Sequence, residues 1–257
     1  EQDRAVYALC RPERLLDLVR RFTVFDAGVR KIARHQQFFS IRTAIERLKA
    51  RDIDGRRKGG VIWHTQGSGK SLTMVMLGRA LALDKAVKNP RILIVTDRDD
   101  LDKQIKDTFK SCDLEPVRAA TGANLIELIR NRTPLVTTII NKFDTAMKAG
   151  DFKDDSADIF VLVDESHRSQ TGRYGGHGKF ALKMRRILPN ACYLGFTGTP
   201  LLKKDKNTLD TFGGLIHKYT IDQAVKDEAV VPLLYEGRLV EQQVSGDVVD
   251  TWFDKIS

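Results

Sequence analysis

The sequence predicts an α/β fold with a doubly wound, mainly parallel sheet and helices on both faces. Strand-like and helix-like segments alternate between residues 61 and 196, and this alternation is typical of a parallel sheet. The strand-like segments are nearly continuous apolar runs, such as IFVLV at 159–163, which is the composition of strands buried on both faces. Because crossovers between parallel strands are right-handed, the helices between them complete one doubly wound domain.

Local patterns define the elements in order. Apolar residues with helical spacing predict helices at 12–22 and 36–50, and the basic, glycine-containing stretch 51–60 indicates a loop. The expected strands are 61–64, 91–96, 135–140, 159–163 and 192–196. The expected helices between them are 72–86, 99–110, 124–131 and 180–188. After residue 200 we expect a charged loop at 203–207, a helix at 221–228 with the capping box Thr220 and Gln223, and a strand at 232–240.

Composition restricts the class of protein. The 257 residues are 42% apolar, enough for a substantial core in one large or two small domains. The net charge of +9 mildly favours a polyanionic partner such as nucleic acid. Three distant cysteines without a C-x-x-C motif predict neither a zinc site nor a disulfide framework, so a cytoplasmic location fits best. We expect no membrane span and no signal peptide, and the start at Glu1 suggests a piece of a longer chain.

The stretch VIWHTQGSGKS at 61–71 has the features of a phosphate-binding loop between a strand and a helix. Gly67 and Gly69 allow backbone N–H groups to face an anion, Lys70 would reach the β- and γ-phosphates, and Ser71 would hold Mg²⁺. The first glycine of G-x-x-x-x-G-K-[ST] is replaced by His64, which removes no phosphate ligand. The alternative is a glycine-rich turn with an unrelated lysine.

Two further motifs follow later strands. IFVLVDESH places Asp164 and Glu165 at the carboxyl end of a strand, where open α/β sheets bind ligands. Asp164 suits Mg²⁺ binding and Glu165 suits activation of the attacking water. GFTGTP at 195–200 places Thr197 and Thr199 at the same edge of the sheet.

The three motifs, in this order and spacing, resemble the motor domains of superfamily 2 helicases and translocases. The longer segments around these motifs are similar to sequences of the restriction (R) subunit of type I restriction–modification enzymes. These segments are IWHTQGSGKSLTM, VTDRDDLDKQI, VDESHRSQTG and LGFTGTP. The resemblance covers roughly residues 12–240, and His64 belongs to the family's Trp-His-Thr-Gln wording.

The resemblance implies the first RecA-like lobe of a P-loop NTPase motor. Such subunits hydrolyse ATP with Mg²⁺ to translocate double-stranded DNA before they cut it, and they work with methylation and specificity subunits in the cytoplasm of bacteria or archaea. The implied catalytic residues are Lys70, Asp164 and Glu165, and the implied metal ligands are Ser71 and Asp164. The implied nucleotide contacts are Gln36, Thr65, Gln66, Gly67, Ser68, Gly69, Lys70 and Ser71, with Gln36 reading adenine.

Coupling and DNA contacts are also carried over from the resemblance. The residues that the resemblance implies for coupling nucleotide state to movement are His167, Arg168, Thr197 and Thr199. The residues that the resemblance implies for contact with the DNA backbone are Thr96, Arg98, Thr138 and Lys142. Their side chains are of types suited to phosphate contact rather than base reading. We expect His35, His177 and His217 to be structural or exposed.

The expected organisation is N-terminal helices with the glutamine motif at 1–50, the ATP-binding lobe at 51–202, and a connector toward a second lobe at 203–257. A second lobe and a nuclease are not expected within this chain. Another superfamily 2 motor, such as a type III restriction or repair enzyme, is the first alternative. A GTPase is a further alternative, because Asn-Lys-Phe-Asp at 141–144 matches the guanine-reading motif of GTPases. The order of the motifs argues against it, since this motif precedes DESH rather than following it.

Overall fold

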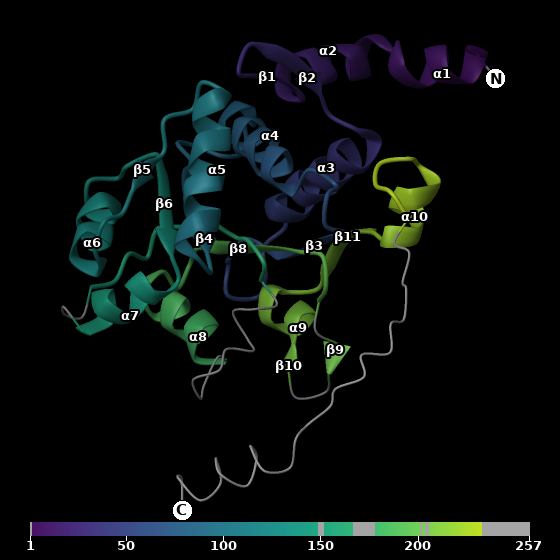
Figure 1. Ribbon diagram of the computed structural model, residues 1–257. Coiled ribbons are helices and arrows are strands. Elements are labelled where there is room, and N and C mark those ends of the chain that lie inside the picture. Colours follow the sequence, from purple (N-terminus) through teal and green to yellow (C-terminus); the bar gives the residue numbers. More distant parts are fainter. Residues whose placement is uncertain (1, 149–151, 167–177, 201, 204–205, 233–257) are drawn as a thin grey trace, which may run out of the picture.

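The centre of the molecule is a seven-stranded sheet in which all neighbouring strands run parallel. The computed structural model describes residues 2–148, 152–166, 178–200, 202–203 and 206–232. The strand order is β11-β3-β8-β7-β4-β6-β5 (Figure 1). The parallel sheet and its doubly wound topology confirm the predicted fold class.

The sheet strands are β3 (Gly60–His64), β4 (Arg91–Thr96), β5 (Val117–Arg118), β6 (Leu135–Ile139), β7 (Ile159–Val163), β8 (Cys192–Thr197) and β11 (Leu215–Tyr219). The helices are α1 (Gln2–Leu9), α2 (Pro12–Arg21), α3 (His35–Lys49), α4 (Lys70–Leu83), α5 (Asp99–Ser111), α6 (Gly122–Arg130), α7 (Asn141–Lys148), α8 (Gly178–Ile187), α9 (Thr208–Phe212) and α10 (Ile221–Lys226). Two small antiparallel pairs lie outside the sheet, β1 (Thr23–Asp26) with β2 (Val29–Ile32) and β9 (Leu202–Lys203) with β10 (Lys206–Asn207).

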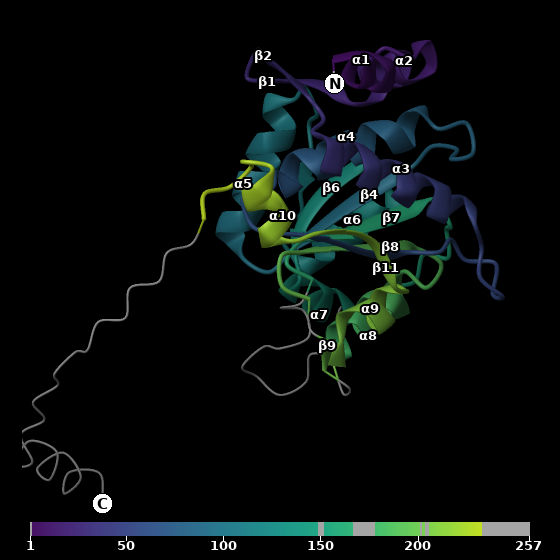
Figure 2. The ribbon, with the colours of Figure 1, turned by 90° about the vertical axis from the view of Figure 1, so that its right-hand side faces the viewer.

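Helices cover both faces of the sheet, as the continuous apolar strands predict. Alternate residues of each strand join different cores: Phe160 packs with α3, α4 and α5, whereas Val161 packs with α6, α7, α8 and α9. Figure 2 shows α3 and α4 on one side of the sheet and α7, α8 and α9 on the other. Both side chains are fully buried, which is why these strands lack the alternation of half-buried strands.

The sequence patterns missed short elements and misjudged one charged segment. The charged stretch 203–207, expected as a loop, contains one residue of β9 and all of β10, because two-residue strands have no detectable pattern. The helix at 12–22 is confirmed as α2, but none of its residues is buried, and Leu15, Leu16 and Val19 are exposed. The expected strand at 232–240 lies almost wholly outside the described residues.

Strand β11 extends the sheet beyond residue 202, where we expect the ATP-binding lobe to end. It pairs with β3 along Leu215–Tyr219, so residues from the expected connector contribute to the same core. The following helix α10 has the expected capping box, with Thr220 accepting from the Gln223 backbone N–H, and ends at Lys226 rather than residue 228. The domain boundaries themselves stay a prediction.

Candidate functional site

The phosphate-binding loop connects β3 to α4 at the carboxyl edge of the sheet. Gly67 and Gly69 have φ angles of 80° and 86°, a conformation that other residues adopt at a cost. Gly69 is the N-cap of α4, so the helix begins at Lys70 and its free N–H groups face the loop. A helix N-terminus of this kind attracts phosphate because of its partial positive charge.

Internal hydrogen bonds hold the loop in shape. The Ser68 hydroxyl donates to the Thr65 carbonyl at 2.6 Å, and the Thr73 hydroxyl donates to the Gly69 carbonyl at 3.0 Å. Among the described residues, the Lys70 ammonium has only a long contact, 3.5 Å, to the His64 carbonyl. Lys70 therefore has donors available for a phosphate oxygen. Ser71 is partly exposed at the start of α4, and Gln66 is exposed.

Asp164 and Glu165 follow β7, which is two strands away from β3. Burial, and then the nearby charge of Glu165, raise the pKa of Asp164 to about 6, while the charge of Lys70 opposes this rise. Asp164 and Lys70 are therefore close enough to interact. The Oδ1 atom of Asp164 is buried and has no hydrogen-bond partner among the described residues.

That unpaired carboxylate oxygen fits a divalent cation. The described part of the chain contains no cluster of three His, Cys, Asp or Glu side chains that could hold a metal. Mg²⁺ needs no such cluster, because it commonly uses one or two carboxylates together with waters and substrate phosphates. Glu165 adopts φ 47°, and a non-glycine residue in this region stores strain of the kind that gathers at functional sites.

The third motif packs against the phosphate-binding loop. The Trp63 indole N–H donates to the Gly198 carbonyl at 3.0 Å. A Cβ atom at Gly198 would lie 3.3 Å from the Gln66 backbone nitrogen, so only glycine fits here without displacement. Thr197 is buried and Thr199 is exposed. The structure thus brings all three motifs together, whereas His167 and Arg168 lie outside the described residues.

A cavity of about 360 Å³ adjoins the loop on the side of α3. Its lining residues are Lys31, Ile32, Arg34, Gln37, Gly67, Ser68, Gly69, Leu72 and Met76. Its mix of apolar walls and a few polar groups is typical of small-molecule sites. The sequence patterns did not predict a site at Lys31, Ile32, Arg34, Leu72 or Met76, because the cavity joins a hairpin to a helix far along the chain.

Gln37, and not Gln36, lines this cavity. The Gln37 side chain donates to the Gly69 carbonyl at 3.1 Å and accepts from the Arg34 backbone N–H at 2.9 Å. Gln36 is 1% exposed, and neither of its amide atoms has a hydrogen-bond partner among the described residues. Neighbouring residues on a helix point about 100° apart, so of the two glutamines Gln37 faces this cavity, and the adenine-reading role of Gln36 stays a prediction.

His64 lies beneath the loop and pairs with a histidine from the edge strand. Its Nε2 is 2.9 Å from Nδ1 of His217 on β11, which is the partner that the sequence did not identify. His35 is also paired, 3.3 Å from the Asp227 carboxylate. His177 lies outside the described residues. The His64–His217 pair joins the strand before the phosphate-binding loop to the strand that leads into α10.

This histidine pair should make folding stability depend on pH. Burial, and then the charges of His217, Lys70 and His35, lower the pKa of His64 from 6.5 to about 3. The unfolded chain therefore binds more protons below pH 6.5, and stability that is full above that pH is lost progressively as pH falls toward 3. In urea denaturation, His64→Gln should reduce the loss of unfolding free energy between pH 7.5 and pH 5.5 by about 1 kcal/mol. An equal loss in variant and wild type would contradict this role.

The four candidate DNA contacts differ in exposure. Thr96 and Thr138 are 1% and 0% exposed, and their hydroxyls donate to the carbonyls of Arg98 and Ile139. Lys142 donates to the Ala119 carbonyl from a partly buried position. Arg98 has 63% of its side chain exposed and lies 3.9 Å from the Asp97 carboxylate, so it is the more accessible of the two cations among the four.

Comparison with known proteins gives a consistent family assignment. The model of the SWI2/SNF2 ATPase family matches residues 36–257. A putative type I restriction enzyme MjaIXP endonuclease subunit of Methanocaldococcus jannaschii is 35% identical over 99% of this chain. The type I restriction enzyme HindI endonuclease subunit of Haemophilus influenzae is 38% identical over 89% of it. The chain spans about a quarter of each relative, 24% in both cases.

Solved structures share the fold at low sequence identity. The UvsW helicase from bacteriophage T4 is 18% identical with a TM-score of 0.55, and the match covers 80% of this chain and 67% of that one. The Type ISP restriction-modification enzyme LlaGI, solved with a DNA substrate mimic, is 16% identical with a TM-score of 0.53 over 88% and 23%. No helix among the described residues is both long and apolar enough to span a membrane.

Proposed function

We propose a function for this chain from the premise that it belongs to the SWI2/SNF2 ATPase family and that its relatives are endonuclease subunits of type I restriction enzymes. The chain is the ATP-binding first motor lobe of such a subunit. In the complete subunit, ATP hydrolysis drives translocation of double-stranded DNA before cleavage. The second lobe and the nuclease belong to the rest of the subunit, since the chain spans 24% of its relatives.

The observation that carries the proposal is that Lys70 and Asp164 share the carboxyl edge of the sheet, since Lys70 begins the helix after β3 and Asp164 directly follows β7. One side offers a cation at a helix N-terminus, and the other offers a buried carboxylate with an unpaired oxygen. The charge of Lys70 acts on the pKa of Asp164, which supports a common site. ATP with Mg²⁺ fits both groups, because the negative phosphates would bind the lysine and the Mg²⁺ ion would bind the carboxylate.

Each residue has a role in this site. The backbone N–H groups at 67–71 would cradle the phosphates, with Thr65, Gln66 and Ser68 completing the loop, and Lys70 would hold the γ-phosphate. Ser71 and Asp164 would hold Mg²⁺, which neutralises charge on the phosphates when bound. Glu165 would accept a proton from the attacking water. The adenine would occupy the cavity beside the loop, with Gln37 reading its edge.

DNA and protein partners follow from the family. The net charge of +9 and the exposed Arg98 favour a DNA backbone contact, with Lys142, Thr96 and Thr138 supporting the surrounding loops. Thr197 and Thr199, together with His167 and Arg168, would couple the nucleotide site to the DNA. Methylation and specificity subunits would complete the assembly in the cytoplasm of a bacterium or archaeon.

The test compares this chain with the complete subunit. We expect the chain alone to bind ATP·Mg²⁺ weakly and to hydrolyse it very slowly, because arginines from a second lobe can contribute about 10³–10⁵ in rate. Addition of duplex DNA should stimulate phosphate release by the complete subunit and not by the chain. DNA-stimulated hydrolysis by the chain at the rate of the complete subunit would contradict the assignment as a single lobe.

A further inference from the structure

A second pocket, which we call the basic pocket, lies at the opposite edge of the sheet from the nucleotide site. Gly59, Ala191 and Gly213 line it, and they precede strands β3, β8 and β11. It is therefore at the amino ends of these strands, whereas the phosphate-binding loop follows the carboxyl end of β3. The volume of the basic pocket is about 340 Å³.

Positive charge dominates the basic pocket. Its charged lining residues are Arg47, Arg56, Arg57, Lys58, Arg185 and Asp52. The one carboxylate, on Asp52, already accepts backbone N–H groups of Asp54 and Arg56 at 3.0 Å and 2.8 Å. Among the described residues the only ion pair of the five cations is a 3.5 Å contact between Arg56 and the exposed Asp54. The charge of the pocket is therefore largely uncompensated.

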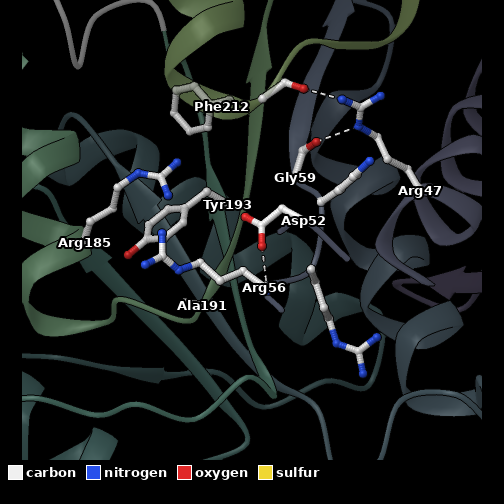
Figure 3. A pocket seen from close by; sticks show the side chains of 11 residues that line it. Arg47, Asp52, Arg56, Gly59, Arg185, Ala191, Tyr193 and Phe212 are labelled. Atoms are coloured by element: carbon white, nitrogen blue, oxygen red, sulfur yellow. Dashed lines mark hydrogen bonds between the residues drawn. The ribbon is translucent and has the colours of Figure 1, made fainter. Parts of the chain in front are cut away.

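Main-chain carbonyls hold three of the arginines in place. Arg47 donates to Gly59 and Gly213, Arg57 to Leu48 and Ala86, and Arg185 to Thr211. These bonds use one or two of the five N–H groups of each guanidinium. The Arg185 guanidinium also lies 4.6 Å from the centre of the Tyr193 ring. Figure 3 shows Arg185 and Arg56 beside Tyr193, with Arg47 across the pocket near Gly59.

Repulsion among the cations of the basic pocket favours the binding of an anion. The Nε atoms of Arg56 and Arg57 are buried and have no hydrogen-bond partner among the described residues, and Arg57 as a whole is 8% exposed. Five cations around one cavity repel each other, and a multiply charged anion in the cavity would relieve this repulsion.

We propose that the basic pocket binds phosphate groups, supplied either by a nucleic-acid backbone or by a free polyphosphate. The planar fork of arginine matches phosphate oxygens, and several cations around one cavity suit a multiply charged ligand better than a single carboxylate. The pocket is separate from the ATP site, so it does not depend on the proposed function. If the source is DNA, the basic pocket adds a contact at the edge of the lobe opposite the nucleotide.

NMR of the arginine Nε–H groups of this chain tests the proposal, with pyrophosphate as the probe. Titration should shift the Nε–H resonances of Arg56 and Arg57. The double variant Arg56→Gln, Lys58→Gln should weaken this binding by about tenfold, the value expected when charge-assisted hydrogen bonds are lost. Both side chains lack hydrogen bonds to the core, so the variant should fold. Arg186→Gln, an exposed arginine next to Arg185 on α8, is the matched control and should bind as wild type.

Duplex DNA distinguishes the two sources of phosphate. If DNA is the source, it should displace pyrophosphate, and the double variant should lower the salt dependence of DNA binding by about one to two released ions. If DNA does not displace the probe, a free polyphosphate is the ligand. Absence of the Nε–H shifts in the wild type, or a pyrophosphate affinity of the double variant equal to that of the wild type, would overturn the proposal. ATP hydrolysis by the complete subunit is measured separately, so a failure there leaves this result interpretable.

Discussion

Glu165→Gln in the complete subunit should reduce ATP hydrolysis by about 10²–10⁴, the usual contribution of a general base. Glutamine keeps the size of the side chain but cannot accept a proton from water. ATP affinity should change little, because the phosphates contact the loop at 67–71. Single-turnover hydrolysis measures the first effect, and a fluorescent ATP analogue measures the second.

The strained backbone of Glu165 should persist in this variant, since the φ of 47° belongs to the main chain. Glu115→Gln, at an exposed position, is the matched control and should hydrolyse ATP like wild type. Hydrolysis by Glu165→Gln within tenfold of wild type would show that another group activates the water.

Lys70→Ala should reduce both ATP affinity and hydrolysis, with a loss in rate of about 10²-fold or more, comparable with removal of one donor that stabilises transition-state charge. Within the part of the chain that the structure describes, the Lys70 ammonium makes only a 3.5 Å contact to the His64 carbonyl, so the fold should survive its removal. Steady-state hydrolysis by the complete subunit, with thermal unfolding as the check on the fold, measures this outcome.

The control for Lys70→Ala is Lys85→Ala, which removes an exposed lysine after α4 and should leave hydrolysis unchanged. A variant at Lys70 that hydrolyses ATP at the wild-type rate would remove this residue from the site. The two variants at Lys70 and Glu165 differ in affinity, and this difference separates phosphate binding from water activation.

The fold could be predicted because its signals are local and strong. Continuous apolar strands, and the glycines at 67 and 69 between a strand and a helix, are visible within ten residues of sequence. Short elements such as β5 and β11 were missed, because the two residues of β5 are too few to show a period and LIHKY at 215–219 is not a continuous apolar run. β11 is stabilised as a strand by its pairing with β3, and such long-range pairing cannot be predicted from the residues of β11 alone.

The candidate site was predictable in its motifs and not in its contacts. The motifs at 64–71, 164–165 and 197–199 meet because the carboxyl ends of parallel strands share one edge. The His64–His217 pair joins residues 153 positions apart, and no local pattern reports such a distance. The sequence alone does not show which side of α3 faces the loop, so it could not predict that Gln37 rather than Gln36 lines the cavity.

The candidate DNA contacts show the same limit. Residue type favoured Thr96 and Thr138, but both hydroxyls are buried within the sheet and donate to nearby carbonyls. Exposure is a tertiary property, so a polar residue at a strand end can be either a ligand or a support for the loop that follows. Arg98, which is exposed at the start of α5, fits direct contact best.

If the loop at 67–71 and the Asp164 carboxylate form one ATP·Mg²⁺ site, calorimetric titration of this chain should show saturable binding of ATP·Mg²⁺ at one site. Binding should be weaker when Mg²⁺ is chelated, and GTP should not be preferred. Lys70→Ala should abolish the heat of binding, and Lys85→Ala should not. Binding of equal strength by wild type and Lys70→Ala, or no binding by wild type at millimolar ATP, would show that these residues do not form such a site.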